Sequence, residues 1–144
     1  METTIPLFES EFVGNLIPQK FPFVMIDKMF SYNETEIVAG IQITEDNIFT
    51  HHGYFTESGL VEHMAQSVAL HTGYQFYLRN EPAPTGYIGS IKEIEIKKLP
   101  KLNEEVQTTV TILQEFGGIT LVDLVSRING EIIATGQMKT VLAS

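Results

Sequence analysis

Apolar and polar residues alternate along several stretches of the chain, and the period of that alternation separates strands from helices. Residues 36–44 (EIVAGIQIT) place four apolar side chains on one face, as in a half-buried strand: Ile37, Ala39, Ile41 and Ile43. The apolar residues 23–32 are predicted to form the preceding strand, and the turn at 33–35 allows a hairpin between the two. Upstream, residues 9–16 show helical spacing, and Pro18 ends that predicted helix.

The longest helical pattern begins at Ser58 or Gly59 and continues to about Arg79, with Ser58 as the candidate cap. Its apolar and small residues form a broad stripe: Leu60, Val61, Met64, Ala65, Val68, Ala69 and Thr72. Such breadth is typical of a helix that is buried on most sides. A helix of roughly 20 residues extends about 30 Å, enough to cross a small domain.

Four strands are predicted after this helix, at residues 86–99, 105–115, 119–128 and 131–142. Asn129-Gly130, between the last two, is the strongest hairpin signal in the chain. One antiparallel sheet and one long helix must bury each other, which predicts an α+β architecture. We expect a hot-dog fold, in which the sheet wraps around the central helix, and a single domain over residues 1–144. An exposed sheet edge makes a dimer the expected assembly.

The composition is compatible with one globular domain, since 43% of the 144 residues are hydrophobic. No apolar run approaches the roughly 20 residues that span a bilayer, so we expect no membrane segment. The first residues lack the basic start of a signal peptide. The absence of cysteine excludes disulfides and thiol catalysis, and we expect a cytoplasmic protein.

The formal net charge is −9, which argues against nucleic acid as a partner. Four of the nine basic residues nevertheless cluster within ten positions: Lys92, Lys97, Lys98 and Lys101. A local basic patch on an acidic protein suits a specific acidic partner. The alternative is that these lysines discourage aggregation along an exposed strand edge.

Three stretches of the chain together resemble a known family: IPQKFPFVMIDK (17–28), DNIF (46–49) and GLVEHMAQ (59–66). They are similar to the 3-hydroxyacyl-[acyl-carrier-protein] dehydratases of the FabZ/FabA superfamily, and most similar to the ApeP-like branch of aryl-polyene and flexirubin clusters. That family opens with a Leu-Pro-His-Arg-x-Pro-Phe motif and carries Glu-Ala-Met-Ala-Gln on its central helix. The likeness extends from about residue 8 to residue 142.

The resemblance implies dehydration by a histidine and a carboxylate from opposite subunits of a dimer. By motif, Glu62 matches the helix carboxylate that protonates the leaving hydroxyl. His52, three positions after Phe49, matches the base that removes the α-proton, with His51 as the fallback. The expected substrate-binding residues are Phe49, Ser58, Gly59, Gln66 and Tyr87, where Ser58 and Gly59 would offer N–H groups and Gln66 would orient Glu62.

The same resemblance implies acyl carrier protein as the partner, docked on Lys92, Lys97, Lys98 and Lys101. The phosphopantetheine arm belongs to that carrier, so we expect no cofactor and no metal in this chain. The expected assembly is a homodimer or a higher even oligomer.

Two other functions fit the same fold. Glu62 could instead activate water in an acyl-thioesterase, or the chain could be a non-catalytic subunit that binds acyl thioesters. The segment from His52 to Glu62 is several residues shorter than in FabZ-type enzymes, and His51 stands where the family has glycine. This departure favours keeping the non-catalytic alternative open.

Overall fold

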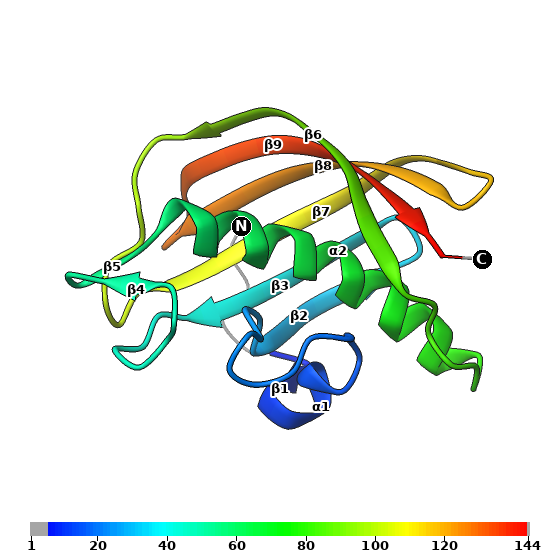
Figure 1. The fold of residues 1–144 in the computed structure, drawn as a ribbon, viewed down its shortest axis with the longest axis horizontal. Coiled ribbons are helices and arrows are strands. Elements are labelled where there is room, and N and C mark those ends of the chain that lie inside the picture. Colours follow the sequence, from blue (N-terminus) through cyan, green and yellow to red (C-terminus); the bar gives the residue numbers. More distant parts are fainter. Residues whose placement is uncertain (1–5, 144) are drawn as a thin grey trace.

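The computed structural model describes residues 6–143 and shows one long helix, α2 (Glu57–Leu78), enclosed by a curved antiparallel sheet (Figure 1). The seven strands lie in the order β1 (Phe8–Glu9), β2 (Lys28–Asn33), β3 (Glu36–Gln42), β7 (Glu105–Phe116), β8 (Ile119–Ile128), β9 (Glu131–Leu142) and β6 (Gly86–Ile96). A short helix, α1 (Ser10–Gly14), lies beside β1. This arrangement confirms the predicted α+β hot-dog fold.

The core lies between α2 and the concave face of the sheet. The inward face predicted for residues 36–44 is buried throughout: Ile37, Ala39 and Ile41 on β3, and Ile43 directly after it. From the helix, Leu60 and Met64 enter the same apolar cluster. Helix α2 is therefore buried on most sides, as the sequence predicted. Within residues 6–143 no helix combines the length and apolarity needed to cross a membrane.

The C-terminal hairpin forms as expected around its turn. Asn129 and Gly130 both have positive φ, 50° and 82°, the backbone that a two-residue type I′ turn requires. Strands β8 and β9 have the predicted bounds, and Ile128 pairs with Glu131 across the turn.

The predicted strand at residues 23–32 is only partly correct, because β2 begins at Lys28. Side chains of α2 bind the preceding backbone instead of a neighbouring strand. The Met25 N–H donates to Gln66 Oε1 across 2.6 Å, and the Met25 carbonyl accepts a 2.8 Å bond from His63 Nδ1. Since these bonds satisfy the buried backbone groups, the segment needs no ladder partner there.

The start of α2 also differs from the prediction. The cap is Thr56 and not Ser58: Thr56 Oγ1 accepts a 3.3 Å hydrogen bond from the Gly59 N–H. The segment before this cap contains a hairpin of β4 (Thr50–His51) and β5 (Tyr54–Phe55), for which no strand was predicted. Positive φ at the two residues between these strands gives the tight turn a two-residue hairpin uses.

Candidate active site

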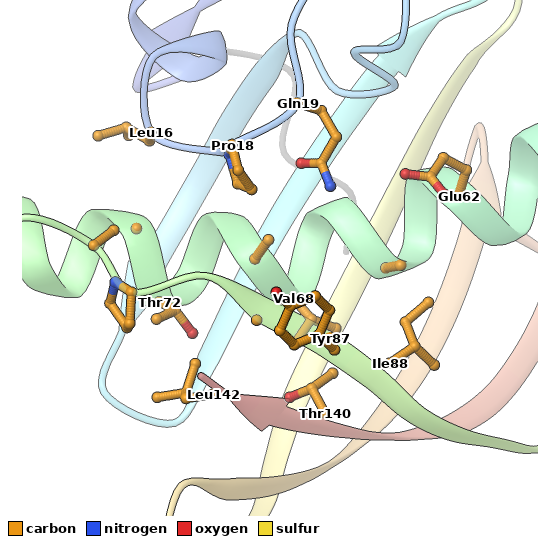
Figure 2. Close-up of a pocket in the computed structure, with 16 residues that line it drawn as sticks. Leu16, Pro18, Gln19, Glu62, Val68, Thr72, Tyr87, Ile88, Thr140 and Leu142 are labelled. Atoms are coloured by element: carbon orange, nitrogen blue, oxygen red, sulfur yellow. The ribbon is translucent and has the colours of Figure 1, made fainter. Parts of the chain in front are cut away.

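A cavity of about 260 Å³ opens between α2, β6, the end of β9 and the loop at residues 16–19 (Figure 2). Most of its wall is apolar or small: Ala65, Val68, Ala69, Tyr87, Ile88 and Leu142. Glu62 and Gln19 lie on the same side of the cavity, one from α2 and one from the loop. The cavity is therefore amphipathic, with a carboxyl and an amide at one end of a largely hydrophobic surface.

Small residues on α2 allow the loop to form this wall. Ala65, Ala69 and Gly73 recur every four residues and so lie along one face of the helix. A Cβ atom added to Gly73 would lie 1.9 Å from the carbonyl oxygen of Leu16. The loop backbone thus packs directly on the helix, and this close approach places Pro18 and Gln19 in the cavity wall.

Glu62 is half-buried and is held by the residue one helical turn away. Gln66 Nε2 donates to Glu62 Oε2 across 2.7 Å. The same nitrogen donates to the Phe23 carbonyl across 2.9 Å, while Gln66 Oε1 accepts from the Met25 N–H. Gln66 is 1% exposed. The Glu62 carboxyl group is therefore held by an amide that two backbone groups, the Phe23 carbonyl and the Met25 N–H, hold in turn.

His63, adjacent to Glu62, is fully buried and points into the core. Its Nε2 lies 2.8 Å from Thr108 Oγ1, which in turn lies 2.7 Å from Ser126 Oγ. Burial lowers the pKa of His63 from 6.5 to about 4, so the imidazole is neutral near pH 7. It joins the 23–25 segment to the sheet and has no role at the cavity, as expected for a packing residue.

The two candidate bases lie at the exposed turn of the β4–β5 hairpin, near the N-terminal end of α2 (Figure 1). His52 has a φ of 50°, and its ring centroid lies 4.1 Å from that of His51. The hairpin is anchored by two backbone bonds, from the Phe55 N–H to the Pro100 carbonyl and from the Leu102 N–H to the Gly53 carbonyl. Within residues 6–143, neither histidine is hydrogen-bonded or ion-paired to Glu62.

The predicted substrate-binding residues occupy different places. Tyr87, on β6, lines the cavity and is 62% exposed. Phe49 packs beneath the first turn of α2, where its Cβ leaves no room for a side chain on Gly59. The Gly59 N–H is already used by the Thr56 cap, whereas Ser58 is exposed on the same turn. Of the predicted substrate-binding residues, Tyr87 lines the cavity and Gln66 holds Glu62, which lines it as well.

The lysines predicted to dock a carrier are exposed along β6 and the segment that follows it. Lys92 lies on β6, and Lys98 pairs with Glu131 on β9, with 3.1 Å between Nζ and Oε1. Lys97 and Lys98 border a shallow depression together with Glu57 at the start of α2. Lys101 lies farther along, beside the β4–β5 hairpin through the bridge between Tyr54 and Lys101.

Sequence reasoning missed Gln19. Its Oε1 is buried, and among the described residues it is the buried side-chain polar atom that lacks a hydrogen-bond partner. The available signal was the IPQK stretch, in which Gln19 stands where the dehydratase motif has histidine. Gln19 lines the cavity with Glu62 because the loop packs on α2 at Gly73. This contact joins residues far apart in the sequence, so no local pattern predicts it.

Sequence comparisons extend over nearly the whole chain. The family model described as ApeP-like, ApeP dehydratase, matches residues 12–143. The FabZ protein of Vibrio cholerae, named 3-hydroxyacyl-[acyl-carrier-protein] dehydratase, is 24% identical over 133 residues, covering 88% of this chain and 86% of that protein. FabZ of Yersinia enterocolitica, with the same name, is 23% identical over 144 residues, covering 96% of this chain and 85% of that protein.

Solved structures share the fold at low sequence identity. The dehydratase heterocomplex ApeI:P from Xenorhabdus doucetiae matches with a TM-score of 0.86 and 14% identity, covering 98% of this chain and 93% of that chain. A hypothetical thioesterase from Streptococcus pneumoniae, solved with coenzyme A, matches with a TM-score of 0.63 and 10% identity, covering 81% of this chain and 84% of that one. At these identities the likeness shows the hot-dog fold.

Proposed function

We propose, since this chain belongs to the ApeP dehydratase family, that it removes water from a 3-hydroxyacyl chain carried by acyl carrier protein. The chain is a dehydratase of 3-hydroxyacyl thioesters. The product would be the trans-2-enoyl thioester. Glu62 would supply the acid, and a histidine would supply the base.

One observation carries the assignment of Glu62: its carboxyl group lies at the polar end of an apolar cavity and is oriented by Gln66. In the proposed reaction the base takes the α-proton of the thioester. The released electron pair forms the double bond between carbons 2 and 3. The bond from carbon 3 to oxygen breaks, and Glu62 protonates the departing hydroxyl to give water.

The proposed base is His52 of a second chain, with His51 as the fallback. A neutral imidazole suits the removal of a proton near pH 7. His52 makes no hydrogen bond or ion pair with Glu62 within residues 6–143, and the proposal therefore takes the two residues of one site from two hot-dog subunits. Strand β6 lies at the edge of the sheet and exposes Tyr87 and Ile88, which line the cavity, and Ile91 farther along the strand, which supports pairing along this strand.

The second subunit is proposed to be another copy of this chain, giving a dimer or a higher even oligomer. The matched Xenorhabdus structure is described as a heterocomplex, so a different hot-dog dehydratase subunit is the other outcome to test. Size measurements on the purified chain, alone and with such a subunit, separate the two. A cytoplasmic location, expected from the sequence, stays a prediction.

The exposed lysines are proposed to bind the carrier. Lys92, Lys97 and Lys98 lie along and just after β6, and Lys101 lies beside the His52 hairpin. Positive charge there would attract an acidic carrier to a chain whose net charge is −9. The phosphopantetheine arm comes with the carrier, and the proposed pair of histidine and carboxylic acid accounts for the loss of water, so the proposal includes no cofactor or metal bound to this chain.

Time-resolved mass spectrometry of a 3-hydroxyacyl carrier protein tests this function. Dehydration lowers the mass of the acylated carrier by one water molecule. Release of free acid would identify a thioesterase, and an unchanged substrate would identify a non-catalytic subunit. The Glu62→Gln variant is the matched control, because it keeps size and shape while removing the acid. It should reduce the rate by at least about 100-fold with an unchanged Tm. Full activity of that variant would overturn the role of Glu62.

A further inference from the structure

The loop at residues 16–19 carries the amide of Gln19, which has no role in the dehydration proposed for Glu62 and His52. Gln19 lines the cavity beside Glu62, and its Oε1 is buried without a hydrogen-bond partner. A buried amide oxygen that lacks a donor destabilises a folded protein. A bound ligand that donates a hydrogen bond to this oxygen would explain why the protein keeps such an atom.

The backbone around Gln19 is held firmly. Lys20 Nζ donates to the carbonyls of Ile17 and Gly14, across 2.9 and 3.2 Å. The Phe23 N–H donates to the Lys20 carbonyl across 2.8 Å, closing a turn directly after Gln19. The loop also packs on α2 at Gly73. The amide is thus presented from a fixed backbone, and its remaining freedom is rotation of the side chain, whose terminal torsion is broad.

We propose that Gln19 contacts the substrate and accepts a hydrogen bond from its 3-hydroxyl group. This proposal rests on the proposed dehydration. When Glu62 is protonated, it donates to the hydroxyl oxygen, which leaves the hydroxyl hydrogen in need of an acceptor. Gln19 lies on the same side of the cavity as Glu62 (Figure 2), and rotation of its amide would turn the oxygen, which lacks a donor, toward the cavity. The hydroxyl hydrogen needs an acceptor and the Gln19 oxygen needs a donor. A hydrogen bond between them would let Gln19 distinguish hydroxylated from saturated acyl chains.

Three ligands test the contact without relying on turnover. The first is a 3-hydroxyacyl pantetheine in which an amide replaces the thioester, which makes the α-proton too weakly acidic to be removed. The second is the same compound without the hydroxyl group, and the third is pantetheine alone. Calorimetry gives the affinity of each for the wild type, Gln19→Met, Gln19→Ala and the matched surface control Gln114→Leu. Gln114 is exposed on β7, outside the cavity.

The hydroxylated ligand should bind Gln19→Met about tenfold more weakly than it binds the wild type, the effect of losing one neutral hydrogen bond. The saturated ligand should bind both proteins equally, and Gln114→Leu should match the wild type throughout. Gln19→Ala should show the same selective loss of affinity for the hydroxylated ligand. This smaller side chain serves as a second test because it cannot crowd the cavity as methionine could.

Equal weakening of the hydroxylated and saturated ligands would overturn the proposal, because Gln19 would then only shape the cavity. Weaker binding of pantetheine alone would place the contact on the carrier arm and would also overturn it. If Gln19 does not distinguish the hydroxylated from the saturated ligand but the protein still dehydrates the authentic thioester, the proposed function stands and only the role of Gln19 is wrong. A wild type that binds the saturated ligand but never dehydrates the thioester would contradict the proposed function alone.

Discussion

Gln66 Nε2 donates a 2.7 Å hydrogen bond to Glu62 Oε2 one turn away on α2, and the same side chain binds the backbone of residues 23–25. One buried amide therefore orients the candidate acid and fixes the segment that would otherwise have to pair as a strand. Stability and activity should consequently respond together when this residue is changed.

Gln66→Leu should lower both stability and dehydration rate. The variant leaves the buried Met25 N–H without a partner and also removes the donor to the Phe23 carbonyl, which should cost about 1–3 kcal/mol of unfolding free energy. It also releases the Glu62 carboxyl, which should slow dehydration by about tenfold or more. Urea unfolding and steady-state kinetics measure the two effects. Glu62→Ala breaks the same contact with Glu62 but spares residues 23–25, so it should lose activity with little loss of stability. A fully active Gln66→Leu protein would contradict the orienting role.

Mixed oligomers test whether His52 and Glu62 come from opposite chains. His52→Ala and Glu62→Gln proteins should each be nearly inactive. If the chain forms homodimers, equal mixing followed by subunit exchange should restore about one quarter of wild-type activity, because half of the dimers then contain one intact site of two. The same mixing with His51→Ala identifies the fallback base. No recovery after confirmed exchange would show that both residues act within one chain or that His52 is not the base.

His63 should make the protein less stable in acid. Burial lowers the pKa of His63 from 6.5 to about 4, so below about pH 6.5 the unfolded chain takes up a proton that the folded chain does not. The stability gained from the neutral, buried imidazole is complete above pH 6.5. It is lost as pH falls towards 4, by up to about 3 kcal/mol.

Unfolding free energies of the wild type and His63→Gln at a series of pH values between 4 and 7 measure this effect. The difference between the two proteins isolates His63, because His71 and the half-buried Asp27 are present in both. A difference that does not change with pH would show that His63 titrates equally in the folded and unfolded chains.

Gly73→Ala should disturb the cavity through the loop at residues 16–19. The added Cβ would meet the Leu16 carbonyl oxygen at 1.9 Å, so the loop must move, at a cost of about 1–3 kcal/mol. Because this loop carries Gln19 into the cavity wall, KM should rise as Tm falls. Gly14→Ala is the matched control, since no atom lies within 4 Å of its added Cβ. Equal behaviour of the two variants would contradict the close packing at Gly73.

Sequence patterns predicted the elements whose determinants are local. The Asn129-Gly130 turn fixes the last hairpin, and the alternation in β3 fixes which side chains face the core. The motif on the central helix identified Glu62, and a spacing of one helical turn identified Gln66 as the residue that orients it. These features depend on residues within one or two turns of each other, where spacing along the chain reflects spacing in the fold.

The features that were missed depend on contacts between distant residues. Residues 23–25 have strand-like composition, but Gln66 and His63, about 40 positions away, satisfy their backbone from the helix. Thr56 replaces Ser58 as the cap because the β4–β5 hairpin, which was not predicted, ends at Phe55 and α2 begins at Glu57. Gln19 reaches the cavity only because Gly73 admits the Leu16 backbone. Side-chain bonds across such separations leave no periodic signal in the sequence.

The three hydrogen bonds of Gln66 have a consequence for the orientation of the substrate. Its oxygen accepts from the Met25 N–H, and both hydrogens of Nε2 are used, so the amide has no reason to turn over. Glu62 Oε2 always receives an N–H, and the proton that Glu62 gives away must therefore reside on Oε1. A single protonated oxygen therefore meets the 3-hydroxyl group from one direction. In the proposed reaction, the acyl chain must enter the cavity with that hydroxyl group turned toward Oε1.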